Sequence, residues 1–401
     1  MRTSDRHEPL AVAFVTDLLG VGGAEVQLVD LVNALDPSRV RAEVAVLRRR
    51  GELFGRIRVP AVSFGMWLPG DPRVLWALGH WLRRGRFDVV YTTHVWATLM
   101  TAHLHRRWQG SARAFGWIDA EHGFRRPAAS RLLEPLRRRA LRRCDRLLAV
   151  STAQAGWIGE YVTPTPPIAV IPNAIDVERY SAAADGAAVR VQLGIPAAAP
   201  VIVSVGRLVA EKGHDTLIRA FAEHLAPAPK PGGAPVHLLL VGEGAARPAL
   251  EAQIAAAPEA VRRRIHLLGL AADTRPLLAA GDLFCLASRH ESMGVALVEA
   301  MAAGLPVVAT RVGGIPEVVA ANETGRLVPP DDPAALAGAL GELLSQPALC
   351  VRFAAAGRAR AQAHFSMAAR AERIEALLAA VAVEHDHGDG ARANPVYTEG
   401  A

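Results

Sequence analysis

Two glutamates lie close to a short turn that contains glycine. Glu291 belongs to this turn, 288–294, and Glu299 lies in the segment that follows the turn. The apolar run 282–287 before the turn predicts a buried parallel strand, and the Ala/Leu/Val/Met run after Gly294 predicts a packed helix. A helix N-terminus attracts anions, whereas carboxylates suit hydroxyl groups. The pattern therefore predicts a ligand with hydroxyls on both sides of an anion, as in a nucleotide sugar.

The alternative is a pair of solvated glutamates on an amphipathic helix. Three features favour a binding site instead: the glycine turn, its place between strand and helix, and a second turn at 313–317. Ser292 is expected to cap the helix, and 305–310 is expected to be the next strand.

Two cations are expected at the end of another strand. The run 201–205 predicts that strand, and Arg207 and Lys212 follow it. Only two lysines occur in the chain, and the other, Lys230, lies in a Pro/Gly-rich loop. Two cations at the mouth of a parallel sheet suit a diphosphate. A surface arginine beside a helix start is the alternative.

The N-terminal half offers a glycine-rich loop and two histidines. Gly22 and Gly23 lie between an expected strand at 10–16 and an expected helix at 24–36. The dinucleotide pattern G-x-G-x-x-G fails because Glu25 occupies its third glycine position. His94 and His122 follow expected strands at 88–92 and 113–118, and ligands of open α/β sheets bind at such carboxyl ends.

These motifs resemble glycosyltransferase family 4, the retaining GT-B transferases, over about residues 10–380. The resemblance implies an α/β fold of two Rossmann-like domains that face each other across a cleft. It also implies that Glu291 contacts hydroxyls of the transferred sugar, that Glu299 binds the ribose, and that Arg207 and Lys212 bind the donor phosphates. The other donor-binding positions would be Met293, Gly294, Val295 and Leu270.

The resemblance assigns the N-terminal half to the acceptor side. His122 would lie beside the transferred sugar as a catalytic residue. Gly22, Gly23 and His94 would line the cleft or bind the acceptor. The segment 172–176 would lead into the interdomain linker, although Ala174 stands where the family has glycine.

The domain boundaries follow from the same reading. We expect an N-terminal acceptor-side domain at 1–180 and a nucleotide-sugar-binding domain at 181–366 that begins with a linker at 181–199. A helix at about 367–383 is expected to pack back on the first domain, and the tail 384–401, which contains two histidines, is expected to be disordered.

The composition of the chain limits where in the cell the protein can be and what it can bind. No apolar run reaches the ~20 residues of a membrane span, the first eight residues are polar, and three isolated cysteines show no metal spacing. We therefore expect a cytoplasmic protein. The net charge of +6 is concentrated in the N-terminal half, with arginines throughout 125–143. This predicts contact with an anionic membrane at its inner face, the alternative being a basic surface that only aids solubility.

The expected activity is hexosyl transfer from a nucleotide-diphosphate sugar to a glycan or lipid-linked acceptor, with retention of anomeric configuration. No D-x-D motif follows a strand, so we expect no metal and no other cofactor. Two rivals remain. A GT-B sugar-nucleotide epimerase would share the donor site, and a non-enzymatic basic binding protein would explain the arginine content alone. With aromatic residues at 5%, we expect no nucleic-acid partner.

Overall fold

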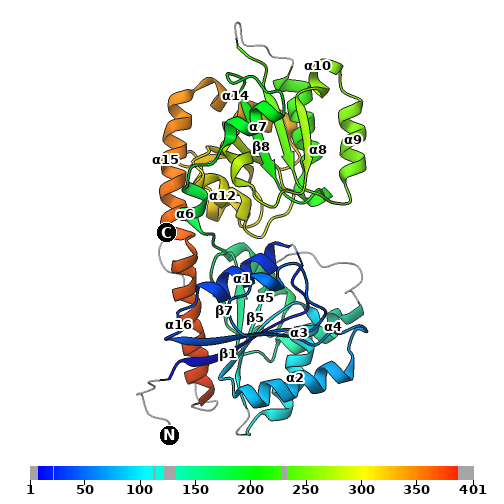
Figure 1. Cartoon of the computed structure of the whole chain (residues 1–401), viewed down its shortest axis with the longest axis vertical. Helices are drawn as coiled ribbons and strands as arrows, with labels where there is room; N and C mark the ends of the chain where they lie inside the picture. The colour runs from blue at the N-terminus through cyan, green and yellow to red at the C-terminus, as the bar shows by residue number, and fades with distance from the viewer. Residues whose placement is uncertain (1–7, 21, 112–113, 122–131, 227–232, 387–401) are drawn as a thin grey trace. The chain divides into compact units, whose positions relative to one another are not determined.

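A computed structural model describes residues 8–20, 22–111, 114–121, 132–226 and 233–386 (Figure 1). The chain forms two compact units. The N-terminal unit comprises Met1–Ala174 and Met367–Ala401, and the C-terminal unit comprises Ile175–Ser366. This division falls before the expected boundary at residue 180, because the helix α6 (Val177–Ser181) packs on α12 (Val295–Ala302) of the C-terminal unit.

The N-terminal unit is built on a seven-stranded parallel sheet with the order β3-β2-β1-β4-β5-β6-β7. Alternate residues of each strand point to opposite faces. Val12 and Phe14 therefore belong to one core cluster, and Ala13 and Val15 to the other. The strands are β1 (Leu10–Thr16), β2 (Val40–Val46), β3 (Ala61–Ser63), β4 (Val89–Thr93), β5 (Gly116–Ala120), β6 (Arg146–Ala149) and β7 (Ile168–Val170).

Helices cover both faces of this sheet. The side chain of Asp71 caps α2 by accepting from the Arg73 N–H, and Ser151 caps α5 by accepting from the Gln154 N–H. The helical segments are α1 (Gly23–Ala34), η1 (Phe54–Arg56), α2 (Pro72–Gly85), α3 (Val95–Trp108), α4 (Glu134–Leu141), α5 (Thr152–Tyr161) and α16 (Met367–Asp386).

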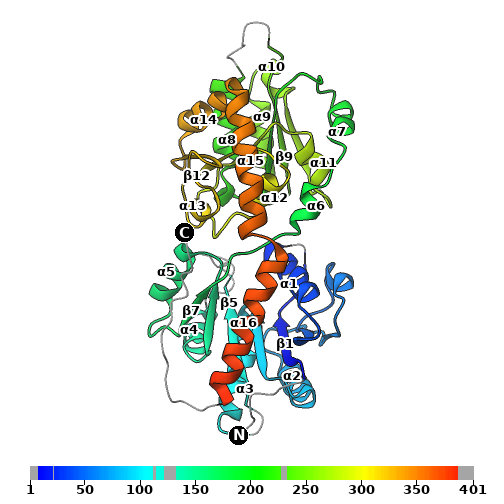
Figure 2. The same ribbon diagram turned by 90° about the vertical axis from the view of Figure 1, so that its left-hand side faces the viewer.

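The last helix, α16, completes the core of the N-terminal unit. It packs against α1 and β5, beside the sheet (Figure 2). Ile374 and Leu378 of α16 are buried with Val12 and Phe14 of β1. Arg370, also buried, donates to Gln27 of α1. The expected return of this helix is therefore observed, although α16 runs to Asp386 and includes the first three residues of the tail that was expected to be disordered.

The C-terminal unit has a six-stranded parallel sheet with the order β10-β9-β8-β11-β12-β13. Its strands are β8 (Val201–Val205), β9 (His237–Val241), β10 (Ile265–Gly269), β11 (Leu283–Leu286), β12 (Val307–Thr310) and β13 (Gly325–Val328). The α/β fold class predicted from the sequence is thus confirmed.

Helices also surround the second sheet. They are α6 (Val177–Ser181), α7 (Gly186–Gln192), α8 (His214–Ala220), α9 (Arg247–Ala255), α10 (Glu259–Arg262), α11 (Arg275–Ala279), α12 (Val295–Ala302), α13 (Ile315–Val318), α14 (Pro333–Ser345) and α15 (Pro347–His364). Two short non-α segments, η3 (Ala210–Lys212) and η4 (Phe221–Leu225), flank α8.

Two segments differ in detail from the sequence expectation. The stretch 181–199, expected to be a linker followed by a new start, contains α7, which Asp185 caps by accepting from the Ala188 N–H. The strand expected at 113–118 is displaced to Gly116–Ala120, where its register with β4 pairs Val89 with Gly116. Parallel pairing, rather than local composition, sets this strand's ends.

No single helix among the described residues has both the length and the apolar composition of a membrane span. Helices α14 and α15 meet that test only when taken together, and they are bent by 102°.

The contact between β5 and α16 gives a first prediction. A Cβ on Gly116 would lie 2.6 Å from Cγ1 and 3.2 Å from the carbonyl oxygen of Val381 in α16. Gly116→Val should therefore destabilise the N-terminal unit by about 1–3 kcal/mol, through overpacking, in urea unfolding followed by far-UV circular dichroism. Gly156→Ala, in α5, is the control because a Cβ there meets open space. Equal midpoints for the two variants would show that α16 does not pack as described.

Candidate functional site

The turn between β11 and α12 carries the first predicted group of residues. Gly294 has φ +91°, a conformation that favours glycine, and it is the N-cap of α12. Ser292 was predicted to cap this helix, but the N-cap position is occupied by Gly294, two residues later in the chain. Met293 is buried and Val295 is half-buried. The second glycine turn contacts this one, since Gly314 donates its N–H to the Glu291 carbonyl at 3.1 Å.

Lys212 and Glu291 form an ion pair across neighbouring loops. Lys212 follows β8 and Glu291 follows β11, and these two strands are adjacent in the sheet. Both side chains are largely buried, and Ser288 Oγ lies 3.4 Å from the same Glu291 oxygen. The structure therefore brings together two of the residues predicted to contact the donor, from positions far apart in the sequence.

Arg207 lies beside this pair. The Lys212 side chain packs over Gly206, where an added Cβ would lie 3.8 Å from Lys212 Cδ. Arg207 is the next residue and is exposed. His214 is buried beside Gly206, where the same added Cβ would lie 3.7 Å from its Nε2. Its pKa is lowered to about 4 by burial and by Lys212, so its ring is neutral at pH 7. The carboxyl end of β8 thus carries one exposed and one half-buried cation.

A second ion network, which was not predicted from the sequence, also joins the loops after β8 and β11. Arg289 pairs with Asp215 at 2.7 Å and with Asp331 at 2.6 Å. Its backbone N–H also donates to the Glu211 carbonyl at 2.8 Å. Hydrogen bonding from Arg289 lowers the pKa of Asp215, so this carboxylate stays charged. These partners lie 42 and 74 residues from Arg289, which is why no local sequence pattern reports them.

Glu299 and Leu270 belong to other parts of the C-terminal unit's sequence: Glu299 to α12 and Leu270 to the segment after β10. Glu299, on α12, is hydrogen-bonded to Tyr180 of α6, whose hydroxyl also contacts Thr274. Burial and the charge of Glu299 raise the pKa of Tyr180, which keeps the phenol neutral. Leu270 directly follows β10 and is 66% exposed. Tyr180 and Thr274 were not recognised from the sequence, because neither residue lies in a motif that suggests a binding site.

In the N-terminal unit, Gly22 and His94 meet through Glu25. Gly22 is the N-cap of α1 and Gly23 its first residue. A Cβ on Gly22 would clash with the Glu25 carboxylate at 2.3 Å, whereas Gly23 has open space around it. Glu25 Oε1 lies 3.6 Å from His94 Nε2. In the sequence, Glu25 is notable only as a mismatch to a dinucleotide motif. In the structure, Glu25 connects the glycine loop to His94.

His94 has a strained backbone. Its φ of +73° and ψ of 167° fall in a region that is essentially reserved for glycine. Its Nδ1 lies 2.9 Å from Thr16 Oγ1 at the end of β1. Burial lowers its pKa to about 4, although Glu121 opposes that shift, so the ring is neutral at pH 7. Such strain concentrates at functional sites, which supports the prediction that His94 belongs to one.

Asp17 holds the start of the helix that follows His94. Its two carboxylate oxygens accept from the backbone N–H groups of Trp96 and Ala97, at 3.1 and 2.7 Å. These are first-turn donors of α3 that have no partner within the helix. Burial nevertheless raises the pKa of Asp17 to about 6. Asp17 was not predicted as a site residue, since an isolated aspartate after a strand has no specific signature.

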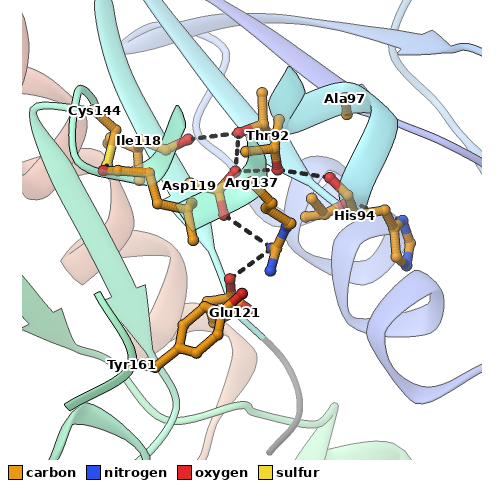
Figure 3. A network of polar contacts seen from close by, with 12 residues as sticks. Thr92, His94, Ala97, Ile118, Asp119, Glu121, Arg137, Cys144 and Tyr161 are labelled. Atoms are coloured by element: carbon orange, nitrogen blue, oxygen red, sulfur yellow. Dashed lines mark hydrogen bonds and ion pairs between the residues drawn. The ribbon is translucent and has the colours of Figure 1, made fainter. Parts of the chain in front are cut away.

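A buried polar network lies behind these residues (Figure 3). Asp119, at the end of β5, accepts from the hydroxyls of Thr92 and Thr98, both at 2.6 Å. Arg137 of α4 pairs with Glu121 at 2.5 Å and lies 3.5 Å from Asp119. Arg137 was expected among the solvent-facing basic residues of 125–143, and this was wrong because its guanidinium is 2% exposed and compensates two buried carboxylates.

His122 lies outside the described residues, so the structure says nothing about the position of this predicted catalytic residue.

The strain at His94 gives the second prediction. His94→Gly and His94→Ala both remove the contacts with Thr16 and Glu25, but only glycine relieves the strained backbone. The glycine variant should therefore be more stable than the alanine variant by about 1–3 kcal/mol, measured by urea unfolding at pH 7.5. Identical unfolding midpoints for the two variants would contradict the backbone conformation.

Comparison with known proteins identifies the family to which this chain belongs. The model described as "Glycosyltransferase Family 4" matches residues 21–179, and the model described as "Glycosyl transferases group 1" matches residues 199–346. A D-inositol 3-phosphate glycosyltransferase of Streptomyces scabiei is 30% identical over 328 residues, covering 78% of this chain and 67% of the relative.

Two further matches are named with different nucleotides. A GDP-mannose-dependent monoacylated alpha-(1-6)-phosphatidylinositol monomannoside mannosyltransferase of Corynebacterium glutamicum is 34% identical over 219 residues, covering 52% of this chain and 55% of the relative. The structure of Anabaena Alr3699/HepE in complex with UDP-glucose superposes with a TM-score of 0.78 and 25% identity, covering 92% of this chain and 100% of that chain. With its two Rossmann-like units, its motifs and these matches, the chain belongs to glycosyltransferase family 4, of the GT-B fold.

Proposed function

We propose that this protein transfers a hexosyl group from a nucleotide-diphosphate sugar to a glycan or lipid-linked acceptor, with retention of anomeric configuration and without a metal ion. The observation that carries the proposal is the pairing of Lys212 with Glu291 at the carboxyl edge of the C-terminal sheet, next to Arg207 and the N-terminus of α12. Family membership and the names of the relatives support the same reaction class.

The donor's parts match the chemistry of these residues. Lys212 and Arg207 would bind the diphosphate and neutralise the charge that develops on the leaving nucleotide. The backbone N–H groups of Gly294 and Val295, behind buried Met293, would add the helix N-terminus to the same task. A donor phosphate at Lys212 would compete with Glu291 for the ammonium group, which leaves that carboxylate to accept from hydroxyls of the transferred sugar.

Glu299 would bind the ribose, and the exposed segment at Leu270 would contact the base. Of the proteins compared above, one is named as GDP-mannose-dependent and one was solved in complex with UDP-glucose. The nucleobase of the donor is therefore to be identified by a binding measurement. Because protein cations supply the diphosphate contacts in this proposal, donor binding should need no added divalent ion.

The acceptor would bind in the N-terminal unit, at the group formed by Gly22, Gly23, Glu25 and His94. Neutral His94 and charged Glu25 can hydrogen-bond hydroxyl groups, and the arginine-rich surface of this unit suits an acidic acceptor. The names of two relatives contain inositol phosphate and phosphatidylinositol mannoside. An acceptor that carries polyol hydroxyls and a phosphate fits both. His122 would lie beside the transferred sugar and act in catalysis.

The donor site can be tested by binding. In a thermal-shift panel of UDP-, GDP- and ADP-sugars without added Mg²⁺ or Mn²⁺, one base should raise the melting temperature of the wild type, because a ligand stabilises the folded state that it binds. Lys212→Ala and Glu299→Gln should reduce that shift. Glu251→Gln, on exposed α9, is the matched control and should keep it. Unchanged donor binding in Lys212→Ala would refute the assignment of the phosphate site.

Transfer distinguishes the enzyme from its rivals. With the donor identified, nucleotide release should require acceptor, and Glu291→Gln should lower kcat by about 100-fold or more. Proton NMR of the product should show the anomeric configuration of the donor. Epimer formation without acceptor would favour the epimerase, and an inverted product would exclude the retaining mechanism.

The membrane partner is proposed from α4 and the residues that flank it. Leu132, before α4, is 92% exposed and Leu136 of α4 is 58% exposed, and Arg139 and Arg142 of the same segment are also exposed. Exposed leucines next to arginines suit the interface of an anionic bilayer.

Co-sedimentation with liposomes tests this proposal. Vesicles with 30% anionic lipid should retain more protein than neutral vesicles at low salt, and Leu136→Asp should weaken that binding. Val351→Asp, at an exposed site of the C-terminal unit, is the control. Equal binding to neutral and anionic vesicles would remove the membrane from the list of partners.

A further inference from the structure

Three potential metal ligands from distant parts of the chain meet in the N-terminal unit. They are His105 in the last turn of α3, Asp145 immediately before β6, and His385 in the last turn of α16. One ligand atom of each lies within 4.8 Å of the other two. Nε2 of His105 and Oδ2 of Asp145 are 3.8 Å apart. Two imidazoles and a carboxylate form a ligand set that suits Zn²⁺.

His105 has the state that a metal ligand needs. Its side chain is 4% exposed, and neither ring nitrogen makes a hydrogen bond of normal geometry to a described residue. The ring packs beside Phe115 and Trp117, with centroids 5.3 and 5.7 Å away. Burial lowers the pKa of His105, which favours the neutral, coordinating form. Asp145 and the Phe115 backbone act on the ring in the opposite direction and raise its pKa. A bound cation would give the buried ring nitrogens a stronger partner than these contacts do.

Asp145 is oriented by the backbone. Its Oδ2 accepts from the Trp117 N–H at 2.7 Å, which fixes the carboxylate toward His105. Ligands of metal sites are commonly held in this way by a second hydrogen bond. Arg143 lies close enough to lower the pKa of His105 and would oppose a cation, whereas Asp145 raises it and would favour one.

His385 is brought to the cluster by an ion pair next to it. Glu384 binds Arg146 at 2.5 Å, and Arg146 directly follows Asp145. This contact holds the end of α16 against the start of β6, so the approach of His385 does not depend on a metal. The partial negative charge of a helix C-terminus also favours a cation there.

We propose that His105, Asp145 and His385 bind one Zn²⁺ ion, with the fourth position taken by solvent. With bonds of about 2 Å, tetrahedral ligands lie about 3.3 Å apart, so the separation between His105 and Asp145 needs to shrink by only a fraction of an ångström. Asp145 precedes β6, whereas His94 follows β4. The zinc site therefore lies at the amino edge of the sheet, opposite the proposed acceptor site, and its role is to fasten α16 to the sheet.

The test uses the full chain, without an affinity tag, after treatment with EDTA and removal of the chelator. Titration with Co²⁺ should give a d–d absorption spectrum that saturates at one equivalent and that Zn²⁺ abolishes. Zn²⁺ should also raise the melting temperature. Asp145→Asn keeps an acceptor for the Trp117 N–H, and His105→Phe keeps an aromatic ring between its neighbours. Both variants should bind Co²⁺ at least about tenfold more weakly.

His103→Ala is the matched control, because His103 lies on the same helix and is exposed. It should bind Co²⁺ as the wild type does. Saturation at one equivalent, together with loss in both variants, supports the site. Absence of a Co²⁺ spectrum in the wild type would overturn it. Unchanged Co²⁺ affinity in His105→Phe and Asp145→Asn would also overturn it, since the ion would then be held by other groups.

Discussion

The ion pair between Lys212 and Glu291 is the interaction on which the C-terminal unit's site depends. It joins the loops after β8 and β11, two adjacent strands whose carboxyl ends would otherwise carry isolated charges. Burying either partner alone would cost several kcal/mol. Each charge therefore makes the other's position possible, and the Arg289–Asp215 pair repeats the connection a few residues away. A site arranged in this way is held in place before any ligand arrives.

The N-terminal unit also has to bury polar side chains near its proposed site, and it does so with more neutral groups. Asp119 is buried but is compensated by two threonine hydroxyls and by Arg137. His94 avoids the cost of a buried charge by remaining neutral, and its strained backbone is held by the packing of β4 and α3 around it. Both edges place polar groups at the carboxyl ends of parallel strands, where helix N-termini supply further donors.

Much of the architecture was accessible from the sequence because it follows local patterns. The bounds of β1, the cap at Ser151 and the strand–turn–helix around Gly294 all depend on neighbouring residues. The ends of β5 were missed because parallel pairing with β4 sets them. Helix α7 was missed because its cap at Asp185 lies in a stretch that resembles a linker. Arg137 of α4 was misassigned because its carboxylate partners, Asp119 and Glu121, lie in and just after β5.

The path of the chain also has a consequence for synthesis. The C-terminal unit occupies one uninterrupted stretch, Ile175–Ser366, whereas the core of the N-terminal unit includes Ile374 and Leu378 of α16. During translation the N-terminal unit therefore cannot complete its core, because the apolar residues of α1 and β5 stay uncovered until α16 has left the ribosome. By then the whole C-terminal unit has been synthesised. The order in which the two halves mature is the reverse of the order in which they are made.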